Sequence, residues 1–422
     1  MAGKGLTIGI DYNDQYCQAC YFSERHGRPE SVSGGTDVLR YLIPSVLCYD
    51  PAAQEWTIGN AALRIADNPG ILVFRELFQH VFSGQTVRVE DREYNYTQLL
   101  AVYFGKLLEF IQIRTSVMGV DSITVTMKSV NRQIKETLEE VFEILKVPAG
   151  KVRLLSASES FGYYIMSEDP KLWQDGALMF DFSSGGFFVK QLNIRFDKDQ
   201  PLVYINEYDF SGDFSVDHLA SEVLRNQMDL KISNLYLDLI AKGNQSSVYF
   251  TGEGFDEQWF TATLNNISGS RRAFKGNNIY VKGACIAGHM NPDAGAFPII
   301  CKGRTRADIS VLAWDNGEQT QILLSPAAVE WYDAGYLGDF ILENEKQIQF
   351  QIHSIVSGAD SSLGMDLSTF PERPPKTTRI QIEIRYSSEY ECEILITDKG
   401  FGDFYPDRGT VVSRKFSLEG YI

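Results

Sequence analysis

The spacing of apolar residues changes near Asp308, and this change limits the possible folds more than any other feature of the sequence. Before it, stretches with apolar residues at three- and four-residue spacing alternate with short apolar runs, as in domains that layer helices on a sheet. After it, apolar residues occupy every second position, as at Ile348, Phe350 and Ile352. We therefore expect an α/β domain over residues 1–303, followed by an all-β sandwich over residues 304–422.

Helical spacing appears at three places in the first domain. Residues 95–113 and 131–146 each present one apolar face, and residues 215–227 are expected to direct Leu219, Val223 and Leu224 inward. Short apolar strands lie between these helices. This alternation predicts a layered α/β domain.

A hairpin with a turn of small residues is predicted from Ala177 to Asn193, where the sequence reads ALMFDFSSGGFFVKQLN. Asp181 ends the first strand, and the turn that follows consists of Ser183, Ser184, Gly185 and Gly186. Backbone N–H groups of such a turn can bind a phosphate, while the carboxylate holds a hydrated Mg²⁺. An ordinary hairpin explains the same residues, and the hairpin alone does not decide between the two interpretations.

Two further segments fit a nucleotide site. Leu6 to Tyr12 and Tyr16 to Phe22 repeat the hairpin plan, with Asp11 near the end of the first strand as a second Mg²⁺ candidate, bound through water. Gly252, Glu253 and Gly254 follow an apolar strand and are predicted to open a helix, a place where a nucleotide can lie against backbone. Glu253 is unfavourable beside a phosphate but acceptable beside a base or ribose.

Charge and cysteine content bear on partners and location. The formal net charge of −16 disfavours nucleic acid or an anionic membrane as the main partner. No apolar run reaches transmembrane length, and the six cysteines resemble thiols of a reducing compartment, so we expect a cytoplasmic protein. Cys17 and Cys20 form a CxxC on a predicted strand, where they point to opposite faces and do not easily share a metal.

The order of these motifs resembles the seventy-kilodalton heat-shock chaperones of the actin-like ATPase superfamily. The resemblance covers nearly the whole chain and rests on the segments IGID (8–11), IPSV (43–46), IGNAA (58–62), RLLSASESFGYY (153–164), LMFDFSSGGFFVKQL (178–192), VYFTGEG (248–254), VKGACIAG (281–288) and the tail 362–402. It implies an α/β actin-like ATPase fold, with two lobes and a duplicated mixed sheet with helices, followed by a C-terminal all-β sandwich. It also implies ATP or ADP with Mg as cofactor, and a protein or extended peptide as the partner of the sandwich.

Several family residues are replaced. The catalytic lysine falls on Leu77, with Arg75 and Glu76 as the nearby charges, and the active-site glutamate falls on Ala157, two residues before Glu159. Residues 211–248 are too few for the subdomain that clamps adenine, and we expect no helical lid.

These replacements predict a pseudo-ATPase or very slow ATPase that binds a protein or peptide through its sandwich. Phosphoryl transfer depends on the charges and positioning groups that are missing here. Asp181 and Glu159 are the remaining catalytic candidates. The alternatives are an active ATP-dependent chaperone in which Glu159 or Arg75 substitutes for the lost groups, and an actin-like scaffold or assembly protein without nucleotide chemistry.

Overall fold

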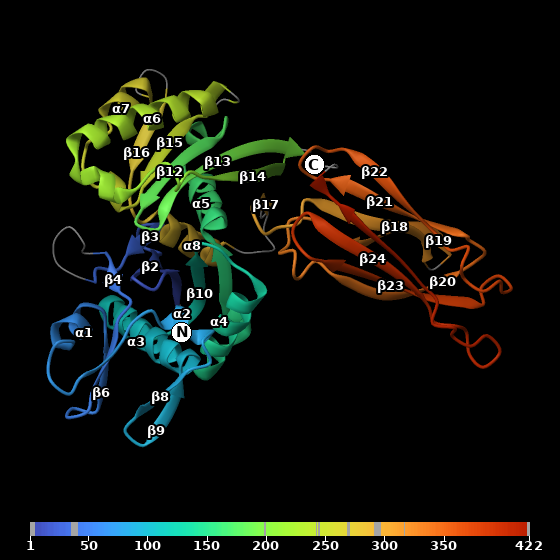
Figure 1. The fold of residues 1–422 in the computed structure, drawn as a ribbon, viewed down its shortest axis with the longest axis horizontal. Coiled ribbons are helices and arrows are strands. Elements are labelled where there is room, and N and C mark those ends of the chain that lie inside the picture. Colours follow the sequence, from blue (N-terminus) through green and yellow to red (C-terminus); the bar gives the residue numbers. More distant parts are fainter. Residues whose placement is uncertain are drawn as a thin grey trace. The chain divides into compact units, whose positions relative to one another are not determined.

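The computed structural model describes residues 5–34, 41–197, 200–241, 243, 245–267, 271–290, 297–315 and 317–419 (Figure 1). The chain divides into two compact units, Met1–Phe297 and Pro298–Ile422. Unit 1 is α/β with mixed sheets, and unit 2 consists of antiparallel sheets.

Unit 1 contains two sheets that share one strand plan. Their strand orders are β11-β10-β1-β2-β3 and, within this unit, β16-β15-β12-β13-β14. In each sheet a central strand, β1 or β12, pairs in parallel with one neighbour and forms an antiparallel hairpin with the other. The first sheet uses β1 (Leu6–Tyr12), β2 (Tyr16–Ser23), β3 (Arg28–Ser31), β10 (Val120–Met127) and β11 (Val152–Ser156). The second uses β12 (Ala177–Ser183), β13 (Gly186–Asp197), β14 (Gln200–Asp209), β15 (Ser247–Thr251) and β16 (Arg272–Lys275).

The helices repeat in the same order along the chain. Each half runs through three strands, a helix, a strand, a helix, a strand and a last helix. The helices of the first half are α3 (Tyr96–Thr115), α4 (Arg132–Ile144) and α5 (Ala157–Met166), and those of the second are α6 (Glu222–Ala241), α7 (Thr261–Ile267) and α8 (Ile279–His289). Unit 1 is therefore an internal duplication, with a repeat 1 over residues 6–166 and a repeat 2 over residues 177–289.

Additional elements interrupt repeat 1 between β3 and α3. They are β4 (Ile43–Pro44), β5 (Leu47–Asp50), β6 (Glu55–Ile58), α1 (Gly59–Ile65), β7 (Leu72–Phe74), α2 (Leu77–Val81), β8 (Thr86–Val89) and β9 (Arg92–Asn95). Short 3₁₀ helices occur at η1 (Ala149–Lys151), η2 (Pro170–Leu172), η3 (Val216–Ala220) and η4 (Glu253–Phe255).

The last helix of each repeat covers the sheet of the other repeat. Helix α8 crosses β1 so closely that a Cβ on Gly9 would lie 2.4 Å from the carbonyl oxygen of Val281. Helix α5 packs on the second sheet, where Phe161 meets Tyr249 of β15 with ring centroids 6.3 Å apart. The two helices also touch each other, because Gly283 allows its backbone to approach Ser160. The exchanged helices tie the two repeats into one body.

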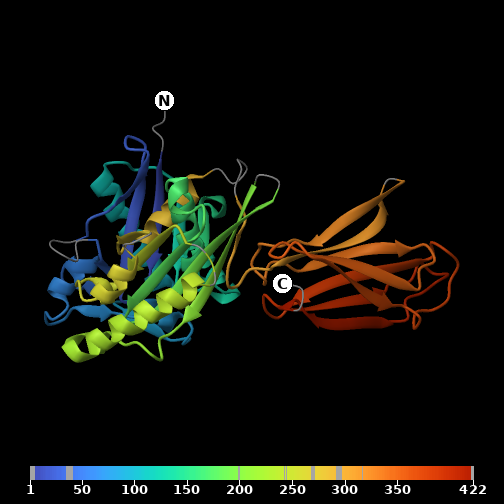
Figure 2. The same cartoon turned by 90° about the horizontal axis from the view of Figure 1, so that it is seen from above.

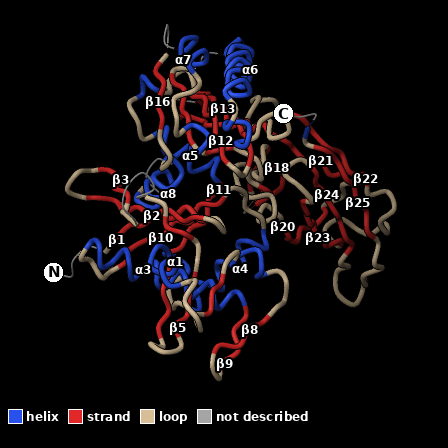
Figure 3. Tube along the Cα trace, turned by 60° about the vertical axis from the view of Figure 1, so that its left-hand side comes forward, coloured by secondary structure: helices blue, strands red, loops and turns tan. Residues whose placement is uncertain are grey.

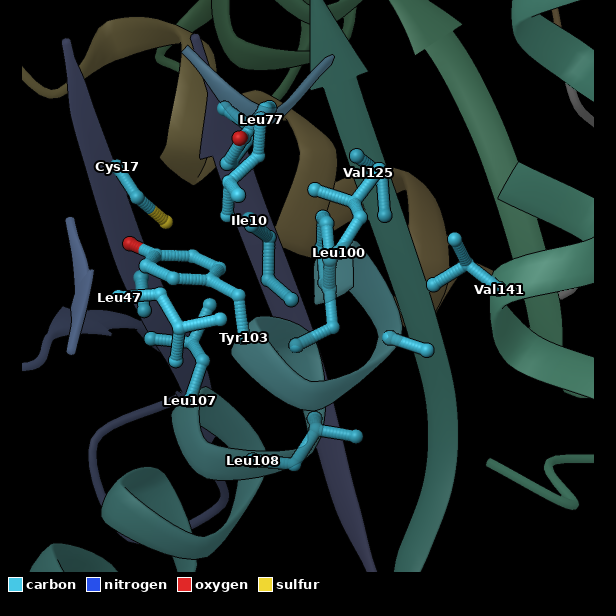
Figure 4. Packing of buried hydrophobic residues seen from close by; sticks show 14 of the residues in the cluster. Ile10, Cys17, Leu47, Leu77, Leu100, Tyr103, Leu107, Leu108, Val125 and Val141 are labelled. Atoms are coloured by element: carbon cyan, nitrogen blue, oxygen red, sulfur yellow. The ribbon is translucent and has the colours of Figure 1, made fainter. Parts of the chain in front are cut away.

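The opposite faces of the sheets carry the two large apolar cores. On the first sheet, α3 supplies Leu100, Tyr103 and Leu107 to a core that also holds Ile10 and Val125 (Figure 4). Asn95 caps the start of α3. Its side chain accepts a hydrogen bond from the N–H of Gln98, and the side chain of Gln98 accepts one from the N–H of Asn95. The predicted helices at 95–113 and 131–146 are confirmed.

The predicted helix at 215–227 is wrong in extent, and of its three inward residues only Leu219 packs against the core. A 3₁₀ turn, η3, occupies its first part, and α6 then runs for twenty residues. Val223 is 66% exposed and Leu224 37% exposed, whereas Met228, Ile232, Tyr236 and Leu239 form the buried face. The apolar residues near the start of this segment suggested a face that the later residues do not continue.

Unit 2 is built of strands and loops (Figure 3). It begins with β17 (Ile299–Ile300), and its two sheets have the orders β19-β18-β21-β22 and β20-β23-β24-β25. The strands are β18 (Ala307–Asp315), β19 (Glu318–Ser325), β20 (Tyr336–Leu342), β21 (Gln347–Ser354), β22 (Asp360–Asp366), β23 (Thr378–Tyr386), β24 (Glu391–Asp398) and β25 (Val411–Ser417). The alternating residues predicted to face inward do so, for Phe350 and Ile382 lie in the shared core.

A buried ion pair lies at the end of β24. Arg373 donates to both carboxylate oxygens of Asp398, at 2.6 and 2.7 Å, and neither side chain is more than 4% exposed.

Within the described residues of both units, no helix is long and apolar enough to cross a membrane.

Candidate functional site

The two predicted Mg²⁺ ligands occupy equivalent positions in the two repeats. Asp11 lies near the end of β1 and Asp181 near the end of β12, and in each case a threonine of the neighbouring parallel strand, Thr126 or Thr251, lies in register with the aspartate. The residues that precede the aspartate in each strand are buried. Each aspartate therefore lies near the carboxyl end of a buried central strand. The duplication therefore brings together two carboxyl groups that are far apart in the sequence.

Both carboxyl groups hold their protons more strongly than usual. Both residues keep part of their surface exposed, but the protein around them removes most of the water from their carboxyl groups. This burial, reinforced by the charge of Asp181, raises the pKa of Asp11 from 3.8 to about 7. Burial also raises the pKa of Asp181, against the opposing effects of Lys190, a hydrogen bond from Tyr280, and Lys128. The coupling between the two carboxyl groups shows that the sheets direct them toward one region of unit 1.

Tyr280 occupies the space beside Asp181. It lies in the first turn of α8, and its hydroxyl donates to Asp181 Oδ2 at 2.5 Å. Burial and the nearby charge of Asp181 raise the pKa of the Tyr280 phenol, so the phenol stays a hydrogen-bond donor at neutral pH. One carboxylate oxygen of Asp181, a candidate metal ligand, thus already accepts a hydrogen bond from the protein.

Two lysines and a glutamate complete the polar cluster on the second sheet. Lys190 on β13 is 3% exposed and forms an ion pair with Glu207, its register partner on β14. Glu207 Oε2 also accepts from the hydroxyl of Ser158 at 2.9 Å. Lys128 follows β10, donates to the carbonyl of Gly185 at 2.8 Å and lies 3.9 Å from the ring centre of Phe188.

The predicted phosphate turn uses its own donors within the protein. The N–H of Ser184 donates to Glu253 Oε1 at 2.6 Å, and the N–H of Gly185 donates to Ser183 Oγ at 3.2 Å. Gly186 has a φ of 122° and would place a Cβ 2.2 Å from Ser211 Oγ, so this position requires glycine for the turn itself. A phosphate at this turn would have to displace the carboxylate of Glu253.

The glycines at 252 and 254 are explained by packing. A Cβ on Gly252 would lie 2.1 Å from the carbonyl oxygen of Phe182, and a Cβ on Gly254 would lie 2.3 Å from its ring. The N–H of Gly252 donates to Asn277 Oδ1 at 3.0 Å. The prediction that this segment opens a helix is wrong, because only the three-residue η4 follows and α7 begins at Thr261.

Glu159, the second catalytic candidate, stabilises the start of α5. Its carboxylate accepts from the backbone N–H of Ser156 at 2.8 Å and from the Ser156 hydroxyl at 3.0 Å, which completes a capping box. Glu159 is buried at 4% exposure. A carboxylate held in this way is positioned for the helix rather than for a reacting water.

The segment that resembles the catalytic-lysine segment is apolar. Leu77 is fully buried in the core of the first sheet (Figure 4), while Arg75 and Glu76 are exposed beside it. Asp14 caps α2 by accepting from the N–H groups of Phe78 and Gln79 at 2.8 and 2.9 Å. The position of the lysine is therefore taken by a packing residue, and the cation of this segment, Arg75, is exposed at the surface.

These residues do not fit a bound Mg-nucleotide. Asp11 and Asp181 are suitable for holding a hydrated Mg²⁺ through water. Across the described residues no group of three or more His, Cys, Asp or Glu could hold a metal ion directly. The N–H groups of Ser184, Gly185 and Gly252 have acceptors within the protein, and the acceptor of Ser184 is the carboxylate of Glu253, which lies where a phosphate was expected. The cluster instead links the repeats, because Ser158 of repeat 1 donates to Glu207 of repeat 2 and Lys128 of repeat 1 donates to the carbonyl of Gly185.

Sequence reasoning missed Lys128, Lys190, Glu207 and Tyr280. Lys190 carried a usable signal, because a single lysine within the apolar run FFVKQL indicates a buried charge that requires a partner. Tyr280 carried none, since its contact with Asp181 spans 99 positions.

Comparison with known families gives a classification without an activity. Residues 28–300 match a family described as a family of unknown function, DUF5716, C-terminal. The chain belongs to this family. Residues 304–418 match a domain of unknown function, DUF8552, and no curated protein matches the chain. The DUF5716 match covers Asp181 and both glycine turns, whereas β1 with Asp11 lies before it.

Proposed function

We propose that unit 1 has the actin-like ATPase fold but acts as a pseudo-ATPase, and that the chain works by binding a protein or extended peptide through its β-sandwich. The duplicated sheets, with matching strand orders and equivalent aspartates, support the fold assignment. We further propose a cytoplasmic location, since the six cysteines are buried thiols, as in proteins of reducing compartments.

One observation carries the loss of activity. The Ser184 N–H, the donor best placed for a phosphate, is bound to the carboxylate of Glu253. A nucleotide would replace this charge-assisted hydrogen bond and bring a phosphate to the same negative side chain. With Leu77 in place of a lysine, the γ-phosphate would also lack the neutralising cation of the chaperone family, while Lys128 beside the turn is bound to the carbonyl of Gly185. The loss of one such contact costs about a hundredfold or more in rate.

The test is ATP turnover by the purified full chain, together with calorimetric titration of Mg-ATP. We expect no turnover above a matched Asp181→Asn variant, and no heat of binding that depends on Mg²⁺. Glu253→Gln serves as a second variant, because it removes the charge and retains an acceptor for Ser184. Turnover at the level of active chaperones that Asp181→Asn abolishes would replace this proposal with the active-ATPase alternative.

The partner half of the proposal is tested separately. A fluorescein-labelled extended peptide of alternating Leu and Ser should bind the full chain saturably, and ATP should leave its affinity unchanged. If the peptide fails to bind at any accessible protein concentration, the peptide-binding role is wrong, while the pseudo-ATPase assignment stands or falls on the turnover assay alone.

A further inference from the structure

The four edge strands of the sandwich differ in how they are protected. A free sheet edge exposes unpaired backbone groups, and charged side chains normally prevent it from pairing with another strand. Strand β20 carries Asp339 at its middle, β22 begins and ends with aspartate, and β25 carries Arg414 and Lys415. Strand β19 has no charged residue from Gln319 to Ser325. In the described part of unit 2, β19 is therefore the edge most open to strand pairing.

The outer part of β19 also lacks a supporting sheet. Strand β18 pairs with β19 as far as Asp315, but its pairing with β21 ends at Val311. Beyond Val311 the hairpin continues as a two-stranded ribbon, which stands away from the other strands in Figure 2 (light orange). Two-stranded ribbons are marginally stable in water, and a third or fourth strand stabilises them.

One face of this ribbon exposes large apolar side chains. Leu312 is 54% exposed, Trp314 65% and Leu323 53%. The register places Leu323 opposite Ser310 and Gln321 opposite Leu312, so these side chains lie on the same face in adjacent rows. On the same face, the side chain of Gln321 donates to Ser310 Oγ at 2.6 Å, a hydrogen bond that joins β19 to β18.

We propose that two copies of this chain associate by antiparallel pairing of their β19 edges, giving a continuous sheet in the order β18-β19-β19-β18. Around a two-fold axis each strand faces itself, so self-pairing requires an edge that does not oppose like charges. Strand β19 meets this requirement from Gln319 to Ser325, and its charged residue, Glu318, stands at the start of the strand. Charged residues lie at the middle of β20 and β25, and the aspartates at the two ends of β22 would face each other if that strand paired with itself over its full length. The charge of −16 repels two copies over most of their surfaces, which favours contact at a neutral strand.

The experiment measures the mass of the full chain in solution by sedimentation and light scattering, from low to high micromolar concentration. We expect a concentration-dependent dimer. Pairing of Gln319–Ser325 with itself is centred on Ile322, so residue 321 of one copy faces residue 323 of the other. The variant Gln321→Lys/Leu323→Lys therefore places like charges across the two-fold axis and should raise the dimer dissociation constant at least about a hundredfold. The variant Gln321→Glu/Leu323→Glu should do the same. Mixing the two variants should restore association, because lysines then face glutamates.

The matched control places the same number of lysines on other edges, as Ser362→Lys on β22 and Ser413→Lys on β25, which are both exposed. It should dimerise as the unmodified chain does. Thermal unfolding of each variant confirms that the sandwich is folded. A monomer at every concentration, or dimers that persist in both β19 variants, would refute the pairing, and mixing without recovery of the dimer would place the contact elsewhere.

Discussion

Replacing Asp11 with asparagine should stabilise unit 1, and the gain should depend on pH. The pKa of Asp11 is about 7 in the folded chain, compared with its usual 3.8. Below about pH 3 the folded and unfolded states both carry the proton, so the carboxyl group has no effect on stability. As the pH rises from 4 to 7, the unfolded chain releases its proton first, and the wild type loses stability relative to Asp11→Asn.

The magnitude follows from the two pKa values. The rise from 3.8 to about 7 corresponds to about 4 kcal/mol at about 1.36 kcal/mol per pH unit. Because Asp11 is partly exposed, solvent screens part of this effect, and we expect about 2 kcal/mol at pH 8. For a unit of this size, that gain raises the unfolding temperature by about 4 °C.

Differential scanning calorimetry at pH 4 and pH 8 measures the effect. The melting temperature of Asp11→Asn should be close to that of the wild type at pH 4 and clearly exceed it at pH 8. Asp67→Asn, which removes an exposed carboxyl group, is the control and should change neither value. An equal gain at both pH values, or a loss at pH 8, would show that Asp11 is not held as an unfavourable buried acid.

Two substitutions test the packing. Gly283→Ala places a methyl group 1.8 Å from the backbone oxygen of Ser160 and should cost at least about 3 kcal/mol by calorimetry, whereas Gly150→Ala, which meets no atom within 4 Å, should change stability by less than about 1 kcal/mol. Equal effects would mean that α5 and α8 do not require this close approach. Arg373→Ala leaves Asp398 buried without its cation and should destabilise unit 2 by about 3–5 kcal/mol in urea denaturation, whereas Arg379→Ala on the exposed face of β23 should cost no more than about 0.5 kcal/mol. A small loss for Arg373→Ala would show that water replaces the ion pair.

Local signals in the sequence predicted the elements that local physics determines. The predicted helical ranges began at Asn95 and Asn131, and the structure shows that both asparagines cap their helices, α3 and α4. An asparagine side chain can cap the first N–H groups of a helix wherever the helix packs, so this signal is local. The two-residue period of β21 and β23 gave their buried faces directly. Strands β20, β22 and β25 were missed, because glycine, serine or charged residues interrupt their apolar alternation.

The candidate site was harder to predict, because long-range contacts decide the role of each residue. The glycines at 252 and 254 looked like a nucleotide turn, yet Phe182, about seventy positions earlier, accounts for both of them. Glu159 looked like a displaced catalytic acid, but Ser156 makes it half of a capping box. The prediction that Asp11 and Asp181 lie near strand ends is confirmed. Their neighbours were not predicted, because Tyr280 comes from α8 and Glu207 from β14.

The exchange of α5 and α8 between the repeats has a consequence for synthesis on the ribosome. Cys20 donates to the carbonyl of Val281, a contact that spans 261 positions. At about 5–20 residues per second, α8 emerges on the order of tens of seconds after the strands that it covers. Until then one face of the first sheet is uncovered in the nascent chain, so repeat 1 cannot finish folding before translation of repeat 2 is nearly complete.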